Sequence, residues 1–238
     1  MELKDKIKLK LDEYLEFDSD LLFRLEKPSD NNKLQIKTLI RVFGGAIRDI
    51  IADMPIHDVD VLVGAKTYKR LYSILESNGY KNMEILSPKD LSSVYSDIRI
   101  INEPHTWIKG HKVIQIIRPV INTQYRKSYE EGFVNLIQNV DISCCGISYD
   151  GNRVYENYPN AISHSLCKSF KCNESAKMYS EKRFLHRKYK LMDRGWSEID
   201  SISESRDFKI NSILSEDKKL EYIKEYEDRF YLNLLKYL

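Results

Sequence analysis

The chain has 238 residues, of which 42% are hydrophobic and 31% charged, and its formal net charge is only +2. The length suits one large domain or two small ones, and the near-neutral charge excludes a strongly basic character of the chain as a whole. No apolar stretch approaches the length of a membrane span, and the N-terminus is charged instead of signal-like, so we expect no membrane association.

The N-terminal segment, residues 1–25, has the periodicity of an amphipathic helix, which we expect to pack at the edge of the domain. Its apolar positions alternate with Lys and acidic residues: Leu3, Ile7, Leu11, Leu15, Leu21, Leu22 and Leu25. A loop rich in Pro, Ser, Asp and Asn follows over 28–32. Residues 39–43 are then apolar and β-prone apart from Arg41, and predict a strand.

Gly44 and Gly45 interrupt this strand and remove two side chains, so the backbone can approach a ligand closely. Residues 46–51 can form a helix immediately afterwards. The N–H groups of its first turn and the positive end of its dipole then point at whatever lies over the glycines, an arrangement that suits phosphate. A glycine pair alone is usually just a turn, so this prediction depends on the residues that follow.

Asp58 and Asp60 lie in the next segment, residues 58–63, which alternates as a strand. Because side chains alternate across a strand, both carboxylates share one face and the valines lie on the other. Magnesium takes one or two carboxylates and completes its shell with phosphate oxygens and water. Next to a phosphate-binding turn, the pair therefore predicts a site for Mg²⁺ with a nucleoside triphosphate, although an isolated Asp-x-Asp is usually only solvated strand polarity.

The middle of the chain alternates between helix and strand signals. We expect a helix over 65–78 ended by Gly79, a strand over 94–101, and a loop or hairpin over 105–110 around Trp107. Residues 112–119 alternate as a strand with Gln115 on one face, together with Val113 and Ile117. The order of strand, helix and strand along this part of the chain predicts βαβ-type layering.

The following elements include another candidate carboxylate, Asp141. We expect a helix over 125–137, then a strand over 140–151 that opens with Asp141 and ends in an Asp-Gly turn. A turn, a short helix and a strand near Phe170 follow. Cys144 and Cys145 lie in an apolar run, and the four cysteines of the chain show no zinc spacing, which favours reduced, buried thiols in a cytoplasmic protein.

A long helix is predicted over 176–196, ending at Gly195. One of its sides is lined by basic residues spaced by four, three and four: Arg183, Arg187, Lys190 and Arg194. Such a face is either merely solvated or binds a triphosphate or RNA. Two further helices are expected over 203–214 and 215–238.

The glycine turn and the two carboxylates together resemble the head domain of the class II tRNA nucleotidyltransferase and poly(A) polymerase family, within the polymerase-β-like superfamily. That family reads Gly-Gly-x-Val-Arg-Asp, a short helix, then Asp-x-Asp. The matching positions, with no insertion or deletion, are Gly44, Gly45, Ile47 (for Val), Arg48, Asp49, Asp58 and Asp60. The resemblance implies an α+β fold: a nucleotidyltransferase head with a mixed sheet flanked by helices over 1–175, and a helical neck and C-terminal region over 176–238.

The resemblance also implies roles for these residues. Asp58 and Asp60 hold two Mg²⁺ ions, with Asp141 as a further catalytic carboxylate, and Gly44 and Gly45 bring backbone N–H groups to the phosphates. Arg48 either pairs with phosphate or fixes Asp49 structurally. In the neck, Arg183 matches the family arginine and, with Arg187, is a candidate for contact with the triphosphate.

The chain also departs from the family pattern. Asp53 stands where the family often has Gly, which we expect to perturb the turn and not the chemistry. In the family a strand near 112–119 has a third carboxylate, where this chain has Gln115; Asp141 could take that role, lie near the ribose, or simply cap its strand. The family's Arg-Arg before that Asp is replaced by Asn139 and Val140. Its neck Glu-Asp falls on Tyr179 and Ser180, with Glu181 as a possible substitute.

These features predict a metal-dependent, template-independent nucleotidyltransferase that transfers a nucleotide from ATP or CTP to an acceptor, most simply an RNA or tRNA 3′ end. One alternative is the same chemistry directed at a protein, a small molecule, or a tRNA as a toxin or regulator. Another is a nucleotide-binding relative that has lost catalysis, against which two adjacent carboxylates argue.

Overall fold

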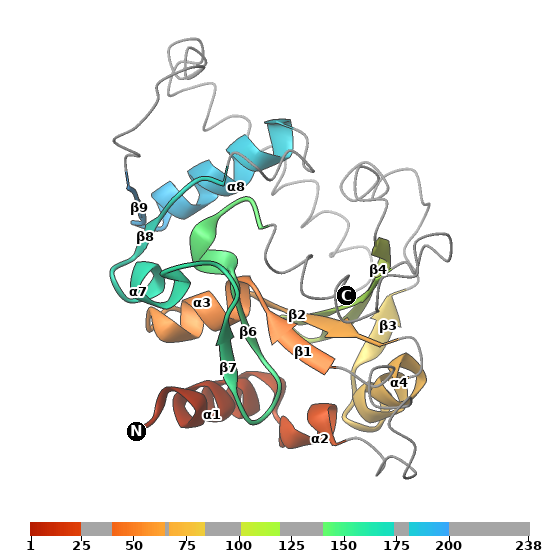
Figure 1. Ribbon diagram of the computed structural model, residues 1–238. Coiled ribbons are helices and arrows are strands. Elements are labelled where there is room, and N and C mark those ends of the chain that lie inside the picture. Colours follow the sequence, from red (N-terminus) through yellow and green to blue (C-terminus); the bar gives the residue numbers. More distant parts are fainter. Residues whose placement is uncertain (25–39, 65–66, 84–100, 120–139, 174–180, 200–238) are drawn as a thin grey trace, which may run out of the picture.

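The computed structural model describes residues 1–24, 40–64, 67–83, 101–119, 140–173 and 181–199 (Figure 1). The helices predicted over 125–137, 203–214 and 215–238 lie outside the described residues, as does the strand predicted over 94–101 apart from its last residue.

Within the described residues, seven strands form one mixed sheet in the order β3-β4-β5-β2-β1-β6-β7. Neighbouring strands are antiparallel except for β2 and β5, which are parallel. The strands are β1 Ile40–Phe43, β2 Asp58–Val63, β3 Lys81–Met83, β4 Ile101–Lys109, β5 Lys112–Pro119, β6 Ile147–Tyr149 and β7 Val154–Glu156. The predicted α+β class with a mixed sheet is confirmed. Of the predicted βαβ-type layering, β1 and β2 are antiparallel neighbours and do not form such a unit, whereas β2 and β5, which precede and follow α4 (Tyr68–Ser77) in the chain, are parallel.

Helices flank this sheet, as Figure 1 shows. They are α1 Leu3–Leu15, α2 Asp20–Phe23, α3 Gly45–Ile51, α4 Tyr68–Ser77, α7 Ala161–Leu166 and α8 Glu181–Asp193, with a short 3-10 turn, η2, at Ser143–Cys145. The main core lies between α1, α3, α4 and one face of the sheet. Val59 and Val61 of β2 are fully buried in it, and so are Ile114 and Ile116 of β5. The predicted alternation of β2 and β5 is therefore confirmed.

The N-terminal segment forms two helices instead of the single helix predicted over residues 1–25. Glu16 ends α1 in the left-handed conformation with φ of 59°, and its N–H donates to the carbonyl of Asp12. The Asp12 carboxylate then accepts the N–H of Ser19 at 2.7 Å, just before α2 begins. These polar contacts end α1, while the expected packing of its apolar face is confirmed by buried Ile7 and Leu11.

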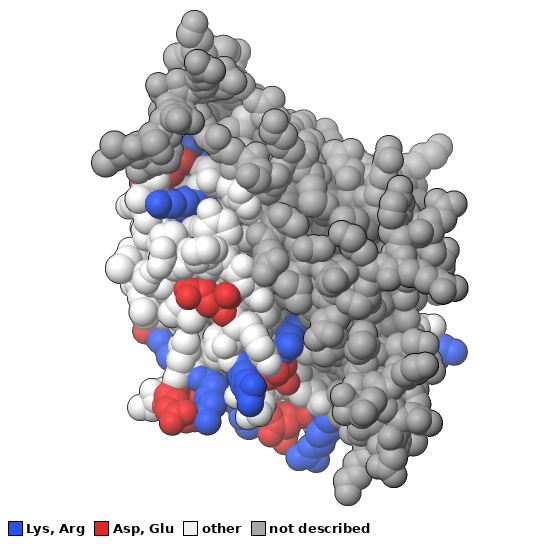
Figure 2. Space-filling model, viewed as in Figure 1, with Lys and Arg blue, Asp and Glu red and all other residues white. Residues whose placement is uncertain are grey.

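The charged residues of this segment pair among themselves. Lys8 contacts Asp12 at 3.1 Å and Asp18 at 2.7 Å. Figure 2 shows blue and red atoms interleaved along the lower edge of the molecule, where α1 and α2 lie in Figure 1. Exposed pairs of this kind contribute little to stability and present neither a uniformly positive nor a uniformly negative surface.

Residues 105–110, predicted as a loop or hairpin, are mostly strand. Strand β4 continues to Lys109 and pairs with β5. The part of the prediction that agrees with the structure is the turn at Gly110, with φ of 57°, which joins the two strands as a hairpin. Trp107 is fully buried in the main core. Proline and charged residues around it hide the alternation that would have indicated a strand.

The strand predicted over 140–151 is interrupted. Ile142 makes an isolated bridge to Cys172, η2 follows, and regular strand starts only at Ile147. The side chain of Ser143 explains the break, because its hydroxyl accepts the N–H of Lys171 at 2.8 Å and lies 2.8 Å from Nδ1 of His164. The predicted Asp-Gly turn is present between β6 and β7. The short helix and the strand near Phe170 are α7 and β8, Ser169–Phe170.

A second, smaller core joins α8 to the part of the protein that contains the seven-stranded sheet (the sheet-bearing part). Leu191 and Trp196 pack there with Phe170, Ile142 and Cys145. Helix α8 starts at Glu181 and ends at Asp193, so the predicted helix over 176–196 is shorter at its C-terminus, and its first residues lie outside the described part. Strand β9, Ser197–Glu198, then pairs with β8. The division at residue 175 stays a prediction. Among the described helices none is long and apolar enough to cross a bilayer.

Candidate nucleotide and metal site

Asp58 and Asp60, which we call the carboxylate pair, lie on the sheet face opposite the main core. Both side chains are half-buried, whereas Val59 between them is fully buried on the core side. Asp60 lies between Phe43 of β1 and Gln115 of β5 in the strand register. The pair therefore faces the same way from one strand, as the alternation of residues 58–63 predicted.

The glycine turn lies directly beside this pair. Gly44 has φ of 74° and ψ of −132°, a conformation that side-chain-bearing residues avoid, and it links the end of β1 to α3. A Cβ atom placed on Gly44 would lie 3.8 Å from Oδ2 of Asp60. The N–H of Gly44 donates to the carbonyl of Ile147 at 3.1 Å, which fixes the turn against β6. The fold thus brings the predicted turn and a predicted carboxylate together.

Gln115 extends the polar row on the same sheet face. It stands next to Asp60 on the parallel neighbour β5, and Thr106 of β4 stands next to Gln115 on its other side. Both Gln115 and Thr106 are half-buried. From the sequence, Gln115 was aligned only with the family's third carboxylate position, and that alignment stays a prediction. The register adds that Gln115 stands beside Asp60.

The donor set of this face suits a hard divalent cation. Carboxylate and amide oxygens are ligands that Mg²⁺ and Mn²⁺ accept, and Asp58, Asp60 and Gln115 supply them from two adjacent strands. Within the part of the chain that the structure describes, no three His, Cys, Asp or Glu side chains gather as a metal-binding group. The residues present therefore fit a cation held by two carboxylates and an amide.

Asp141 does not join the carboxylate pair. Its side chain is 2% exposed, and its Oδ1 lies 2.8 Å from Nη1 of Arg187 on α8. The predicted role of Asp141 as a third metal carboxylate therefore has no geometric support among the described residues. A buried acid with an arginine partner is typical of a structural ion pair.

Arg48 and Asp49 form the second buried ion pair, just after the glycine turn. Nε and Nη2 of Arg48 lie 2.8 and 2.7 Å from Oδ1 of Asp49. The guanidinium also donates to the thiol sulfur of Cys145 at 3.4 Å and lies over the ring of Trp196 at 5.3 Å. Of the two roles considered for Arg48, this geometry is that of the residue that fixes Asp49.

The cysteine beside Arg48 is buried, as the sequence predicted. Cys144 and Cys145 are unpaired and at most 2% exposed. Burial raises the pKa of the Cys144 thiol. The hydrogen bond between the two thiols lowers the pKa of Cys145, and nearby Arg48 lowers it further. Because neither thiol is accessible, we assign them a packing role.

The structure shows what some of the basic residues on and just after α8 contact. Arg187 contacts Asp141, and Arg194, one residue beyond the end of α8, lies 3.5 Å from Oδ2 of Asp49. Arg183 belongs to α8, but its side chain lies outside the described part. Two of the four basic residues are therefore engaged with carboxylates of the sheet-bearing part. Sequence reasoning could not identify these partners, because the periodicity of a helix shows a charged face and not what covers it.

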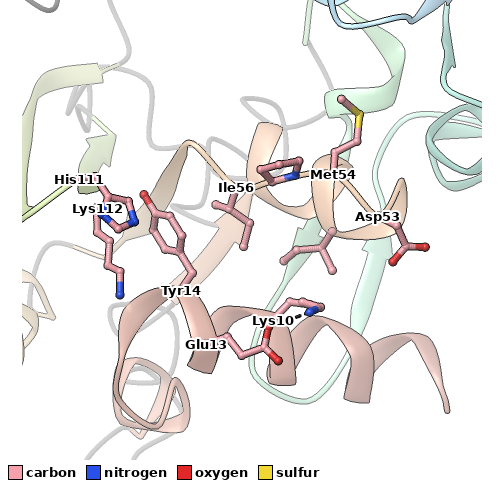
Figure 3. Close-up of a pocket in the computed structure, with 10 residues that line it drawn as sticks. Lys10, Glu13, Tyr14, Asp53, Met54, Ile56, His111 and Lys112 are labelled. Atoms are coloured by element: carbon pink, nitrogen blue, oxygen red, sulfur yellow. Dashed lines mark hydrogen bonds and ion pairs between the residues drawn. The ribbon is translucent and has the colours of Figure 1, made fainter.

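A hollow of about 540 Å³ opens elsewhere, between α1, the loop before β2 and the turn before β5 (Figure 3). Neither member of the carboxylate pair lines it. Its charged residues are neutralised in pairs: Lys10 contacts Glu13 at 2.7 Å and Asp53 contacts Lys6 at 2.8 Å. The hollow is therefore separate from the carboxylate pair.

Tyr14, at the edge of this hollow, joins the two central strands, a role that the sequence did not indicate. Its hydroxyl donates to the carbonyl of His57 at 2.8 Å and accepts the N–H of Val113 at 2.9 Å. Because His57 precedes β2 and Val113 lies in β5, this hydroxyl links the strands that hold Asp60 and Gln115.

The fold is similar to that of solved CCA-adding enzymes. The structure of a CCA-adding enzyme with CTP matches with a TM-score of 0.56 and 10% identity, over 84% of this chain and 44% of that one. One with ATP gives 0.47 and 11%, over 70% and 36%, and Thermotoga maritima CCA-adding enzyme complexed with tRNA gives 0.46 and 11%, over 77% and 42%.

The match thus spans less than half of the length of these neighbours. No protein-family model matches the chain, and no curated protein matches its sequence. At this level of identity the likeness is one of fold. The described part of the chain, with its mixed sheet and flanking helices, thus shares its α+β fold with the CCA-adding enzyme determined with CTP.

Proposed function

We propose that the protein is a metal-dependent, template-independent nucleotidyltransferase, which transfers a nucleotide from a nucleoside triphosphate to an acceptor. The main supporting observation is the position of Gly44 beside Asp60, because it puts a turn without a side chain next to a half-buried carboxylate. The fold of a CCA-adding enzyme determined with CTP supports the same proposal.

In this proposal each group has a defined task. Asp58 and Asp60 hold the divalent cation, and Mg²⁺ when bound offsets the negative charge that develops on the phosphate oxygens. Gly44 and Gly45 leave room for the triphosphate beside Asp60. Arg48 acts indirectly, since its contacts with Asp49 fix the helix that follows the turn. Asp141, Arg187 and Arg194 hold α8 in place next to this helix.

The proposed nucleotide is CTP or ATP and the proposed acceptor is an RNA 3′ end, most simply that of a tRNA. Support comes from the similar fold of the CCA-adding enzyme whose structure was determined with CTP. The departures at Asn139 and Val140 and at Tyr179 and Ser180 keep a protein or small-molecule acceptor as a second candidate.

The test is nucleotide incorporation in vitro. The protein is incubated with Mg²⁺, one α-labelled triphosphate at a time, and total tRNA, and the products are separated by class. Labelled RNA 3′ ends are expected. Label on protein or small molecules would instead support the second candidate.

Asp58→Asn combined with Asp60→Asn should abolish incorporation while leaving the fold intact, because both residues are half-buried on the face away from the main core. Asp53→Asn is the matched control, since Asp53 is exposed and its φ of 54° is one that Asn tolerates. Full incorporation by the double variant, or no label on any acceptor with the native chain, would overturn the proposal.

A further inference from the structure

The position of Gln115 determines how many cations the site can hold. Strands β2 and β5 are parallel, with Asp60 aligned to Gln115 and Asp58 aligned to Val113. Residues aligned on adjacent strands point to the same face, and the strands lie about 4.8 Å apart. The amide of Gln115 is therefore the closest side-chain oxygen donor that β5 offers to Asp60.

An amide oxygen differs from a carboxylate in one respect that matters here. It coordinates a hard cation but adds no charge, so the site of two carboxylates and one amide has a formal charge of −2. This charge balances one divalent cation. Two divalent cations held about 4 Å apart repel each other about four times as strongly as two unit charges, so a second cation needs further negative charge, which substrate phosphates can supply.

The other buried acids near this part of the fold are already neutralised. Asp49 is paired with Arg48 and Arg194, and Asp141 with Arg187. Among the described residues no third acid gathers with the carboxylate pair. The charge that the described residues place on this sheet face therefore balances one divalent cation.

We propose that the protein binds a single divalent cation through Asp58, Asp60 and the amide oxygen of Gln115. This inference rests on the proposed function, since it concerns the same site. Gln115 is then a neutral metal ligand that sets both the number of cations and the affinity for them. Nucleotide transfer by this chain uses one protein-held cation, and any other enters with the triphosphate.

The experiment is a titration of the full chain with Mn²⁺ alone, in which electron paramagnetic resonance measures the free ion. Mn²⁺ is chosen because it is paramagnetic and prefers oxygen ligands. The native chain is expected to bind one Mn²⁺. Gln115→Leu should weaken binding by about tenfold or more, in the range seen when groups that support a metal site are removed. Gln115→Glu should strengthen it by a similar factor.

Two further variants keep the result interpretable. Gln115→Asn keeps the amide but withdraws its oxygen by one methylene, so it should weaken binding while preserving polarity and fold. Asn82→Asp, on the edge strand β3, is the charge control, because it adds the same charge as Gln115→Glu. Asn82 aligns with Trp107, and the side chain of Trp107 lies on the sheet face opposite to that of Thr106 and Gln115. This control should therefore bind Mn²⁺ as the native chain does.

The outcomes separate this inference from the proposed function. If Asp58→Asn with Asp60→Asn abolishes Mn²⁺ binding but the Gln115 variants bind as the native chain does, only the role of Gln115 is overturned. Two Mn²⁺ bound by the native chain would overturn the single-cation count. If the double Asp variant binds Mn²⁺ normally, both the inference and the metal site of the proposed function fail.

Discussion

Arg187 of α8 lies 2.8 Å from Asp141, a carboxylate that is almost completely buried. Arg194, one residue beyond the end of α8, lies 3.5 Å from the carboxylate of Asp49. The basic side of α8 is therefore partly turned towards the sheet-bearing part of the protein, where it meets two acids. The same residues that suggested a polyanion-binding surface act at least in part to hold the helix in position.

We expect Arg187→Ala to lower the free energy of unfolding by about 3 kcal/mol, because it leaves the Asp141 carboxylate buried without its cation. Urea denaturation measures this change. Lys190→Ala, a half-buried lysine on the same helix, is the control and should cost less than about 1 kcal/mol. Equal effects of the two substitutions would show that the Arg187–Asp141 contact is not maintained in solution.

Arg48→Lys distinguishes the two roles considered for this arginine. Lysine cannot reproduce the contacts that Nε and Nη2 make with Asp49, so we expect a loss of about 2 kcal/mol in stability. The KM for the nucleotide should change by less than about twofold below the unfolding transition. A KM raised more than about tenfold at native stability would instead show direct phosphate binding.

Gly44→Ala should destabilise the fold by about 2 kcal/mol through backbone strain, because φ of 74° with ψ of −132° is nearly restricted to glycine. A clash is not the cause, since the added Cβ would lie 3.8 Å from Asp60. Gly110→Ala is the comparison: φ is 57° and the surrounding space is open, so the cost should be only about 1 kcal/mol. Urea midpoints of the two variants measure the difference, and a larger loss at Gly110 would contradict this account.

Stability should fall as the pH drops below about 6.5, partly through His164. Burial lowers the pKa of this imidazole, and nearby Lys171 lowers it further, although Glu156 opposes the shift. The unfolded chain, with the higher pKa, then binds the proton more readily than the folded chain as the solution is acidified. Protonation therefore favours unfolding in the window between the two values.

His164→Gln should flatten the pH dependence of the free energy of unfolding between about pH 5 and 7. Denaturation at several pH values gives the slope of the free energy of unfolding against pH for the native chain and for the variant. A loss of stability that is the same at every pH, caused by the missing contact with Ser143, does not change this slope. The native chain, measured under the same conditions, serves as the reference. An unchanged slope in the His164 variant would contradict the prediction.

The strands at the site could be predicted because their sequences alternate. Residues 58–63 and 112–119 match β2 and β5. In β2 the half-buried Asp58 and Asp60 alternate with buried valines, whereas in β5 only Gln115 interrupts a run of buried residues. Strand β4 was missed because Pro104 and the polar residues around Trp107 resemble a loop, while pairing with β5 decides its conformation. The break at Ser143 depends on hydrogen bonds to residues far along the chain, which no local pattern records.

The candidate site was predictable where spacing alone determines geometry. The turn at Gly44 and the carboxylate pair follow from local sequence, whereas the position of Gln115 beside Asp60 is known only from the strand register. The partners of Asp141, Arg187 and Arg194 were not predictable, because ion pairs between distant segments depend on how a helix docks. A charge on a helix can only be interpreted once its neighbour is known.

The parallel alignment of β2 with β5 also has a consequence for how the protein reaches its native state. Parallel strands cannot be joined by a tight hairpin, so a long intervening segment must be ordered or looped before they pair. Contacts of such high sequence separation are among the slowest to form in a folding chain. We therefore expect Asp60 and Gln115 to meet late during folding, so that a nascent or partly denatured chain that already contains the Gly44 turn lacks the complete set of proposed cation ligands.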